Sequence, residues 1–232
     1  MVGRKTFVTL PLVSIMKIIP FLSLSALMLT LGLSGCKKTE TENISRVKSY
    51  PAITLNGPAV TSINVGEAFT DLGASAVLNG ATIAPLVSGR VDNTTPGFYS
   101  IVYRSANTEG DTVSTSRVVA VVPTSVNNID QSGVFTRASN GVALNVTRIG
   151  KGLYYTENFG GVAPPSAAIQ PAYFAQISPT SLLFPKQLVP GVGNVSFSGP
   201  TFTFNPAGLL TQFTYIVINP GFGAARRTFN RR

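Results

Sequence analysis

The fold is decided by the stretch Thr95-Pro96-Gly97-Phe98-Tyr99-Ser100-Ile101-Val102-Tyr103. A turn opens it, and aromatic and β-branched residues then alternate with other residues, which is the pattern of a β-strand. Ser116 to Val122 alternates in the same way and ends at Pro123. Because no long stretch repeats apolar residues at helical spacing, the sequence predicts an all-β protein.

The residues before this stretch show the same pattern of short strand-like runs separated by turns. Ala52 to Leu55 and Thr61 to Val65 are expected strands. Asn79-Gly80 predicts a tight hairpin, because this pair readily takes the positive φ angles of a two-residue turn. Residues 50–123 therefore form one expected β-sandwich.

The order of these motifs resembles the bacterial immunoglobulin-like domains of secreted and surface proteins. The segments that carry the resemblance are Pro51 to Leu55, Val65 to Phe69, Asp71 to Ala74, Thr95 to Tyr103 and Arg117 to Val122. The resemblance implies an Ig-like β-sandwich. The chain has no Trp and a single Cys, so the antibody type of core, with its disulfide and buried Trp, is excluded.

A polar bridge, Thr124 to Asp130, precedes a second expected β-domain over residues 131–232, either a sandwich or a barrel-like domain. Its expected strands are Gly133 to Arg137, Val142 to Ile149, Leu153 to Tyr155, Val195 to Phe197, Phe202 to Phe204 and Phe213 to Ile218. Val162 to Pro190 is rich in Pro, Ala and Ser and shows no clear pattern. This half resembles the C-terminal domain of two-domain Bacteroidetes lipoproteins of unassigned function, on Gly133 to Arg137 and Gly152 to Tyr155. Such proteins often accompany outer-membrane glycan-uptake systems.

The N-terminus carries an export signal. Basic residues precede the uncharged run Ile18 to Leu33, and the run closes in Leu33-Ser34-Gly35-Cys36. The run is almost long enough for a transmembrane anchor, but its end resembles the lipobox of bacterial lipoproteins. That resemblance implies cleavage after residues 1–35 and a diacylglycerol on the Cys36 sulfur. Residues 36–49 are then a flexible tether, and the start codon is either Met1 or Met16.

The residue after Cys36 is Lys37, not the Asp that retains lipoproteins in the inner membrane of enteric bacteria. Lys37 to Glu42 is polar with acidic residues, and it loosely resembles the export signals of Bacteroidetes surface lipoproteins. We therefore expect an outer-membrane protein, anchored by lipid and facing the cell surface.

Composition argues against catalysis. The chain has no His, and the part after residue 35 carries 15 basic and nine scattered acidic residues. The commonest general base and metal ligand is thus absent, and no thiol remains once Cys36 is lipidated. We expect no enzyme, no metal and no cofactor. Nucleic-acid binding is not expected either, since no basic stripe alternates with aromatics; Arg226, Arg227, Arg231 and Arg232 are expected in a solvated terminal strand.

The candidate ligand-binding residues are Tyr154, Tyr155 and Tyr173, because sugar faces stack on aromatic rings. Glu157, Asn158 and Gln176 are possible polar partners. Adjacent residues on a strand point to opposite faces, so at most one of Tyr154 and Tyr155 belongs to the core. The other interpretation is that these tyrosines only pack the domain. The sequence thus predicts a non-catalytic protein that contacts a polysaccharide or an outer-membrane partner, or a structural lipoprotein without sugar affinity.

Overall fold

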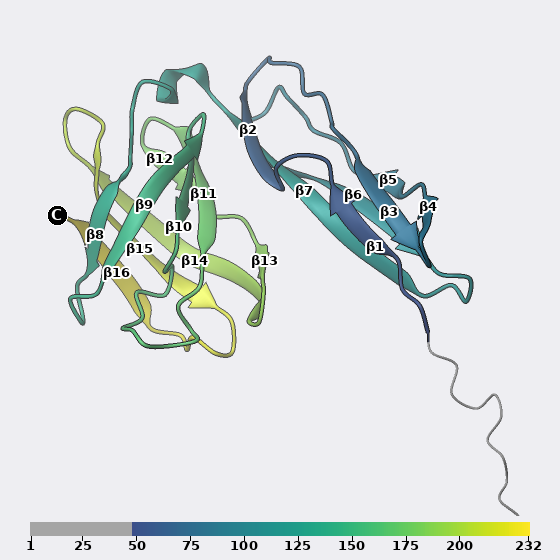
Figure 1. The fold of residues 1–232 in the computed structure, drawn as a ribbon. Helices are drawn as coiled ribbons and strands as arrows, with labels where there is room; N and C mark the ends of the chain where they lie inside the picture. Colours follow the sequence, from purple (N-terminus) through teal and green to yellow (C-terminus); the bar gives the residue numbers. More distant parts are fainter. Residues whose placement is uncertain (1–47) are drawn as a thin grey trace, which may run out of the picture. The chain divides into compact units, whose positions relative to one another are not determined.

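The computed structural model describes residues 48–232 (Figure 1). The expected signal peptide and the expected lipidation site at Cys36 lie outside the described residues. Within the described part the chain forms strands β1 to β16 and one 3-10 helix, η2 (Thr124–Val126), with no α-helix. The predicted all-β class is confirmed. In this part of the chain no helix has the length and apolar character needed to cross a bilayer.

The first seven strands form two sheets that cover the Ig-like segment. They are β1 (Ala52–Leu55), β2 (Val60–Asn64), β3 (Ala74–Leu78), β4 (Ala81–Ile83), β5 (Leu86–Ser88), β6 (Gly97–Ala106) and β7 (Thr112–Val122). One sheet has the order β1-β3-β4 and the other the order β2-β7-β6-β5. The long antiparallel pair β6 and β7, visible in Figure 1, is built from the two alternating stretches of the sequence. Asn79 and Gly80 join β3 to β4 with φ angles of 51° and 81°, as the hairpin motif predicted.

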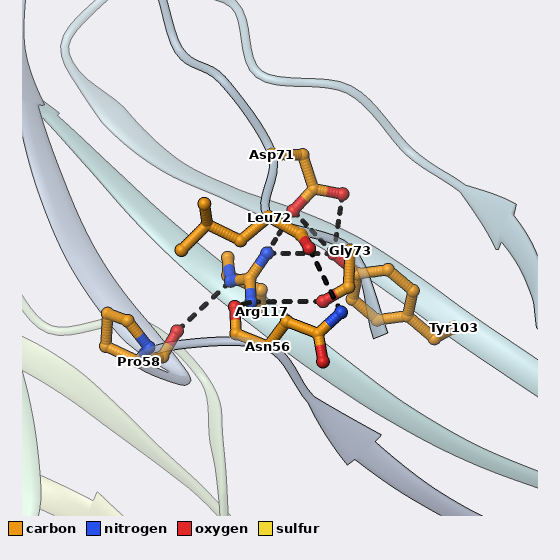
Figure 2. A network of polar contacts seen from close by, with 7 residues as sticks. All are labelled: Asn56, Pro58, Asp71, Leu72, Gly73, Tyr103 and Arg117. Atoms are coloured by element: carbon orange, nitrogen blue, oxygen red, sulfur yellow. Dashed lines mark hydrogen bonds and ion pairs between the residues drawn. The ribbon is translucent and has the colours of Figure 1, made fainter. Parts of the chain in front are cut away.

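A buried arginine ties the two sheets of this segment together (Figure 2). Arg117 on β7 is 1% exposed, and all five of its N–H groups are used. The acceptors are the carbonyl oxygens of Pro58 (3.1 Å), Asn56 (2.6 Å) and Gly73 (3.3 Å), the Tyr103 hydroxyl (3.1 Å) and the Asp71 carboxylate. The Tyr103 hydroxyl in turn donates to Asp71 over 2.6 Å. Two of the motifs behind the Ig-like resemblance, those holding Asp71 and Arg117, thus meet as an ion pair whose arginine is buried.

The remaining strands form one curled sheet of nine strands, a half-barrel. They are β8 (Gly133–Arg137), β9 (Ala143–Gly150), β10 (Leu153–Thr156), β11 (Ala172–Ser178), β12 (Ser181–Leu183), β13 (Gln187–Val189), β14 (Gly193–Phe204), β15 (Leu210–Ile218) and β16 (Arg226–Arg231). Their order is β12-β11-β10-β9-β8-β16-β15-β14-β13. This confirms the barrel-like form of the second β-region and not the sandwich.

A side-chain amide links the two ends of this open sheet. Gln187 of β13, at one end of the strand order, reaches Tyr173 of β11, near the other end. The Tyr173 backbone N–H donates to Gln187 Oε1 over 3.0 Å, and Gln187 Nε2 donates to the Tyr173 carbonyl over 3.1 Å. Gln187 therefore gives β11 the two hydrogen bonds that a further strand would provide, which avoids unpaired backbone groups at this edge.

Aromatic rings fill the concave side of the half-barrel. Phe184, between β12 and β13, lies at the centre, with its ring centroid 4.6 Å from Phe174, 5.1 Å from Phe197 and 5.2 Å from Tyr215. Phe213 belongs to the same cluster, and Phe197 packs against it. The burial of these large apolar side chains is the main stabilisation of this sheet.

The prediction of a solvated terminal strand holds for Arg226 and Arg232, which are exposed, but is wrong for Arg227 and Arg231. β16 does form, but it lies inside the sheet between β8 and β15. Arg227 is buried and donates to the carbonyl oxygens of Gly160 and Phe222. Arg231 donates to the Ser132 carbonyl at 2.7 Å, and its guanidinium lies 4.7 Å from the centre of the Phe135 ring. These cations therefore hold loops in place.

Candidate ligand-binding surface

Strand β10 separates the two adjacent tyrosines of the sequence. Tyr154 points inward and is fully buried, with its ring stacked 5.6 Å from Phe174. Its hydroxyl donates to the Ile129 carbonyl (3.0 Å) and accepts from the Gln131 backbone N–H (3.2 Å). Burial raises the pKa of Tyr154. Tyr154 is thus a core residue without access to a ligand, which corrects its inclusion among the binding candidates.

Tyr155 and Tyr173 lie together on the opposite, outer face. They are direct cross-strand partners in the antiparallel pair β10–β11, so their side chains stand side by side. Tyr155 is 37% exposed, and the half-buried Tyr173 has its ring 5.8 Å from Phe98. Neither hydroxyl forms a hydrogen bond with any of residues 48–232. Burial raises the pKa of Tyr173.

A small hollow of about 100 Å³ opens beside the two rings. Its lining residues come from β10, β11 and the β13 segment: Tyr155, Pro171, Ala172, Tyr173, Gln187, Leu188, Val189 and Pro190. Leu188 is 75% exposed. Two tyrosines, two prolines and a solvent-facing leucine therefore make one continuous apolar surface on the nine-stranded sheet.

The polar residues expected around the tyrosines do not contribute to this surface. Glu157 Oε1 accepts hydrogen bonds from the backbone (3.2 Å) and side chain (2.9 Å) of Asn145. Asn158 is buried and exchanges two hydrogen bonds with the backbone of Val162. Gln176 is fully buried. Among the polar side chains of the hollow, Gln187 is bonded to the Tyr173 backbone, and the two tyrosine hydroxyls have no partner within residues 48–232.

Tyr173 and Leu188 also line a second, larger hollow of about 430 Å³. Its other lining residues are small, β-branched or hydroxyl-bearing: Ala59, Val60, Val102, Ser114, Thr115, Ser116 and Val118. The tyrosine surface therefore continues into a groove whose opposite wall offers hydroxyl groups. Sequence reasoning missed Leu188 and the two prolines, because Val162 to Pro190 shows no strand pattern that would place them.

The described residues hold no cluster of three or more His, Cys, Asp or Glu side chains able to bind a metal ion. The Asp71 carboxylate, 26% exposed, is already engaged by Arg117 and Tyr103. Burial acts to raise the pKa of Asp71, but the hydrogen bonds from Tyr103, the Gly73 backbone and Arg117 outweigh it and lower that pKa below its usual value. This carboxylate is a structural anion.

Three comparisons with known proteins bear on the chain. Residues 53–121 match the family described as bacterial surface protein, Ig-like domain. A search of the curated proteins gives no match. Among solved structures, the chain is similar to the crystal structure of the lipoprotein BT2262 from Bacteroides thetaiotaomicron, with 20% identity and a TM-score of 0.38. That match covers 78% of this chain and 100% of the other. Residues 53–121 are thus a bacterial surface Ig-like domain, as the order of motifs implied.

Proposed function

We propose that the protein is a non-catalytic, lipid-anchored binding protein of the outer membrane that contacts a glycan through Tyr155 and Tyr173. The observation that carries the proposal is the pair of adjacent rings on the outer face of β10 and β11, with both hydroxyls free of partners within the described chain. Aromatic rings present flat apolar faces to the C–H groups of a sugar, and their hydroxyls pair with its hydroxyl groups. The Ig-like domain then acts as a spacer.

Affinity electrophoresis tests the glycan contact. A chain lacking residues 1–36 keeps the whole compact unit Ser49–Arg232 and is run through gels containing a panel of polysaccharides. We expect one polymer to retard it, and Tyr155→Ala or Tyr173→Ala to abolish the retardation. Tyr50→Ala is the matched control, because Tyr50 is 55% exposed and lies outside the surface. If both substitutions leave retardation unchanged, the assignment of this surface is wrong.

The anchor is tested separately, since it depends on Cys36 alone. We expect the full chain to incorporate labelled palmitate and to enter the detergent phase on phase separation. Cys36→Ser removes the sulfur that carries the lipid, and acyl chains supply the membrane affinity. A Cys36→Ser chain that remains labelled and membrane-bound would contradict the proposed anchor.

A structural role is the second candidate, and one observation favours it. Edge strand β5 exposes all three of its residues, and Leu86 and Val87 are 76% and 58% exposed. An exposed apolar edge is suited to pairing with a strand of another protein. Cross-linking of intact cells followed by purification of the protein tests this role. A specific outer-membrane partner, lost in Val87→Lys and combined with no sugar affinity, would support it.

A further inference from the structure

We propose that the hollow beside Tyr155 and Tyr173 receives a methyl-bearing substituent of a neutral sugar, either an acetamido group or the methyl of a 6-deoxy sugar. This inference rests on the proposed glycan contact and narrows it to a class of sugar. Three properties of the hollow carry it: the chemistry of its walls, its size and its lack of charge.

The walls offer almost nothing to a hydroxyl group. Pro171 and Pro190 have no backbone N–H, and Leu188 and Val189 have apolar side chains. Apart from the two tyrosine hydroxyls, the polar side chain of the lining is Gln187, whose amide is buried and bonded at both ends to the Tyr173 backbone. A sugar hydroxyl placed against the proline, leucine and valine walls, away from the tyrosine hydroxyls, gives up its bonds to water without replacement, which is unfavourable. A methyl group gives up no hydrogen bond and gains from burial.

The size of the hollow excludes a whole sugar ring. Its volume is about 100 Å³, whereas pockets that enclose a small-molecule ligand measure roughly 300–1,000 Å³. One substituent of a ring stacked on Tyr155 or Tyr173 fits a space of this size. The tyrosine rings stack on the sugar ring, and the hollow selects among sugars by the substituent that it accommodates.

The lining carries no charge among the described residues. A carboxylate, sulfate or phosphate on the glycan would therefore lose water here without meeting a cation. The hollow accordingly favours a neutral glycan over a uronate-rich or sulfated one. The basic residues described above do not alter this, because Arg227 and Arg231 are committed to backbone carbonyls.

Two oligosaccharides with the same backbone test the inference. Fully N-acetylated chitohexaose, called chitohexaose below, and cellohexaose are both β-1,4-linked hexasaccharides with a gluco backbone and differ only at C2, where the first carries an acetamido group and the second a hydroxyl. We expect chitohexaose, or in the second arm a rhamnose hexasaccharide, to bind at least about fourfold more tightly than cellohexaose. Fourfold is the equivalent of the ~0.8 kcal/mol gained on burying one methyl-sized group. In saturation-transfer NMR the methyl protons should receive the strongest signal.

A leucine substitution tests whether the hollow causes the preference. Leu188→Ala removes part of its wall, and we expect the fourfold preference to disappear. Leu86→Ala is the matched control, because Leu86 is 76% exposed and lies on β5, outside the hollow. Since both leucines are on the surface, neither change should unfold the protein.

The outcomes separate this inference from the proposed function. Equal binding of methyl-bearing and methyl-free hexamers, without saturation of the methyl protons, overturns the inference and leaves the glycan contact intact. Binding of acidic polysaccharides, with no binding of neutral ones, would likewise overturn the inference and leave the glycan contact intact. If no glycan in the electrophoresis panel or the hexamer series binds, both the inference and the proposed function fail.

Discussion

Replacing Asp71 by Asn should destabilise the protein by about 2–3 kcal/mol, because it leaves a buried guanidinium without its anion. Breaking a fully buried pair by removing one partner costs roughly 3–5 kcal/mol. The Arg117 side chain is 2% exposed, but the Asp71 side chain is 26% exposed, so water screens part of the loss. Three backbone carbonyls also continue to accept from Arg117. For a chain of this size the loss corresponds to a fall in Tm of about 5–10 °C.

Urea unfolding followed by circular dichroism measures this change, with an exposed ion pair as the control. Lys151 and Glu67 lie 2.6 Å apart, and their side chains are 45% and 42% exposed. Lys151→Gln should cost less than about 1 kcal/mol, because solvent screens such pairs. The reasoning is refuted if Asp71→Asn costs no more than Lys151→Gln.

The same network predicts how stability depends on pH. The folded-state pKa of Asp71 is below its usual value, so its contribution is complete above about pH 4 and is lost as the pH falls through the folded value. The difference between the wild type and Asp71→Asn should therefore shrink in acid. Burial, followed by the hydrogen bond to Asp71, raises the pKa of Tyr103 to about 12. Stability should fall as the pH rises from about 10 to 12, and Tyr103→Phe should lack this fall.

Two further substitutions test the strand edges by the same unfolding assay. Gln187→Leu should lower the free energy of unfolding by about 2 kcal/mol, because it leaves the N–H and carbonyl of the half-buried Tyr173 without protein partners. Hydrogen exchange at the Tyr173 amide should become faster. Unchanged exchange would contradict the role of Gln187 as hydrogen-bond partner of β11. Gly89→Ala should cost at least about 3 kcal/mol, since φ is +89° and the new Cβ would lie 2.2 Å from the Ser100 carbonyl oxygen. Gly80→Ala, with φ +81° and open space around the Cβ, should cost only about 1 kcal/mol, and equal losses at both glycines would contradict the clash.

Local patterns predicted the parts of the fold that depend on neighbouring residues. The Asn79-Gly80 hairpin follows from the two φ angles that this pair takes at low cost. The alternation along β10 predicted that Tyr154 and Tyr155 face opposite ways, and the structure shows which of them is buried. The Ig-like segment was recognisable because several short motifs occur in a fixed order.

The parts of the fold and of the candidate surface that the sequence did not predict depend on pairing between residues far apart in the chain. Arg231 donates to the carbonyl of Gln131, 100 residues earlier in the chain, and this contact exists only because β16 lies beside β8. A terminal cluster of arginines gives no local sign of that position. Likewise, Gln187 takes the place of a strand for Tyr173, and a three-residue strand is too short to show a period. The surface around Leu188 was therefore invisible in the sequence.

The ring-filled concave side of the nine-stranded sheet has a consequence for how this protein can diversify. Phe184 and its neighbours pack together on that side, so the ligand contact proposed above lies on the outer face. Exposed residues such as Leu188 contribute little to folding, so they can change without cost to the scaffold. Selection can thus retarget the surface of this half-barrel while its interior stays constant.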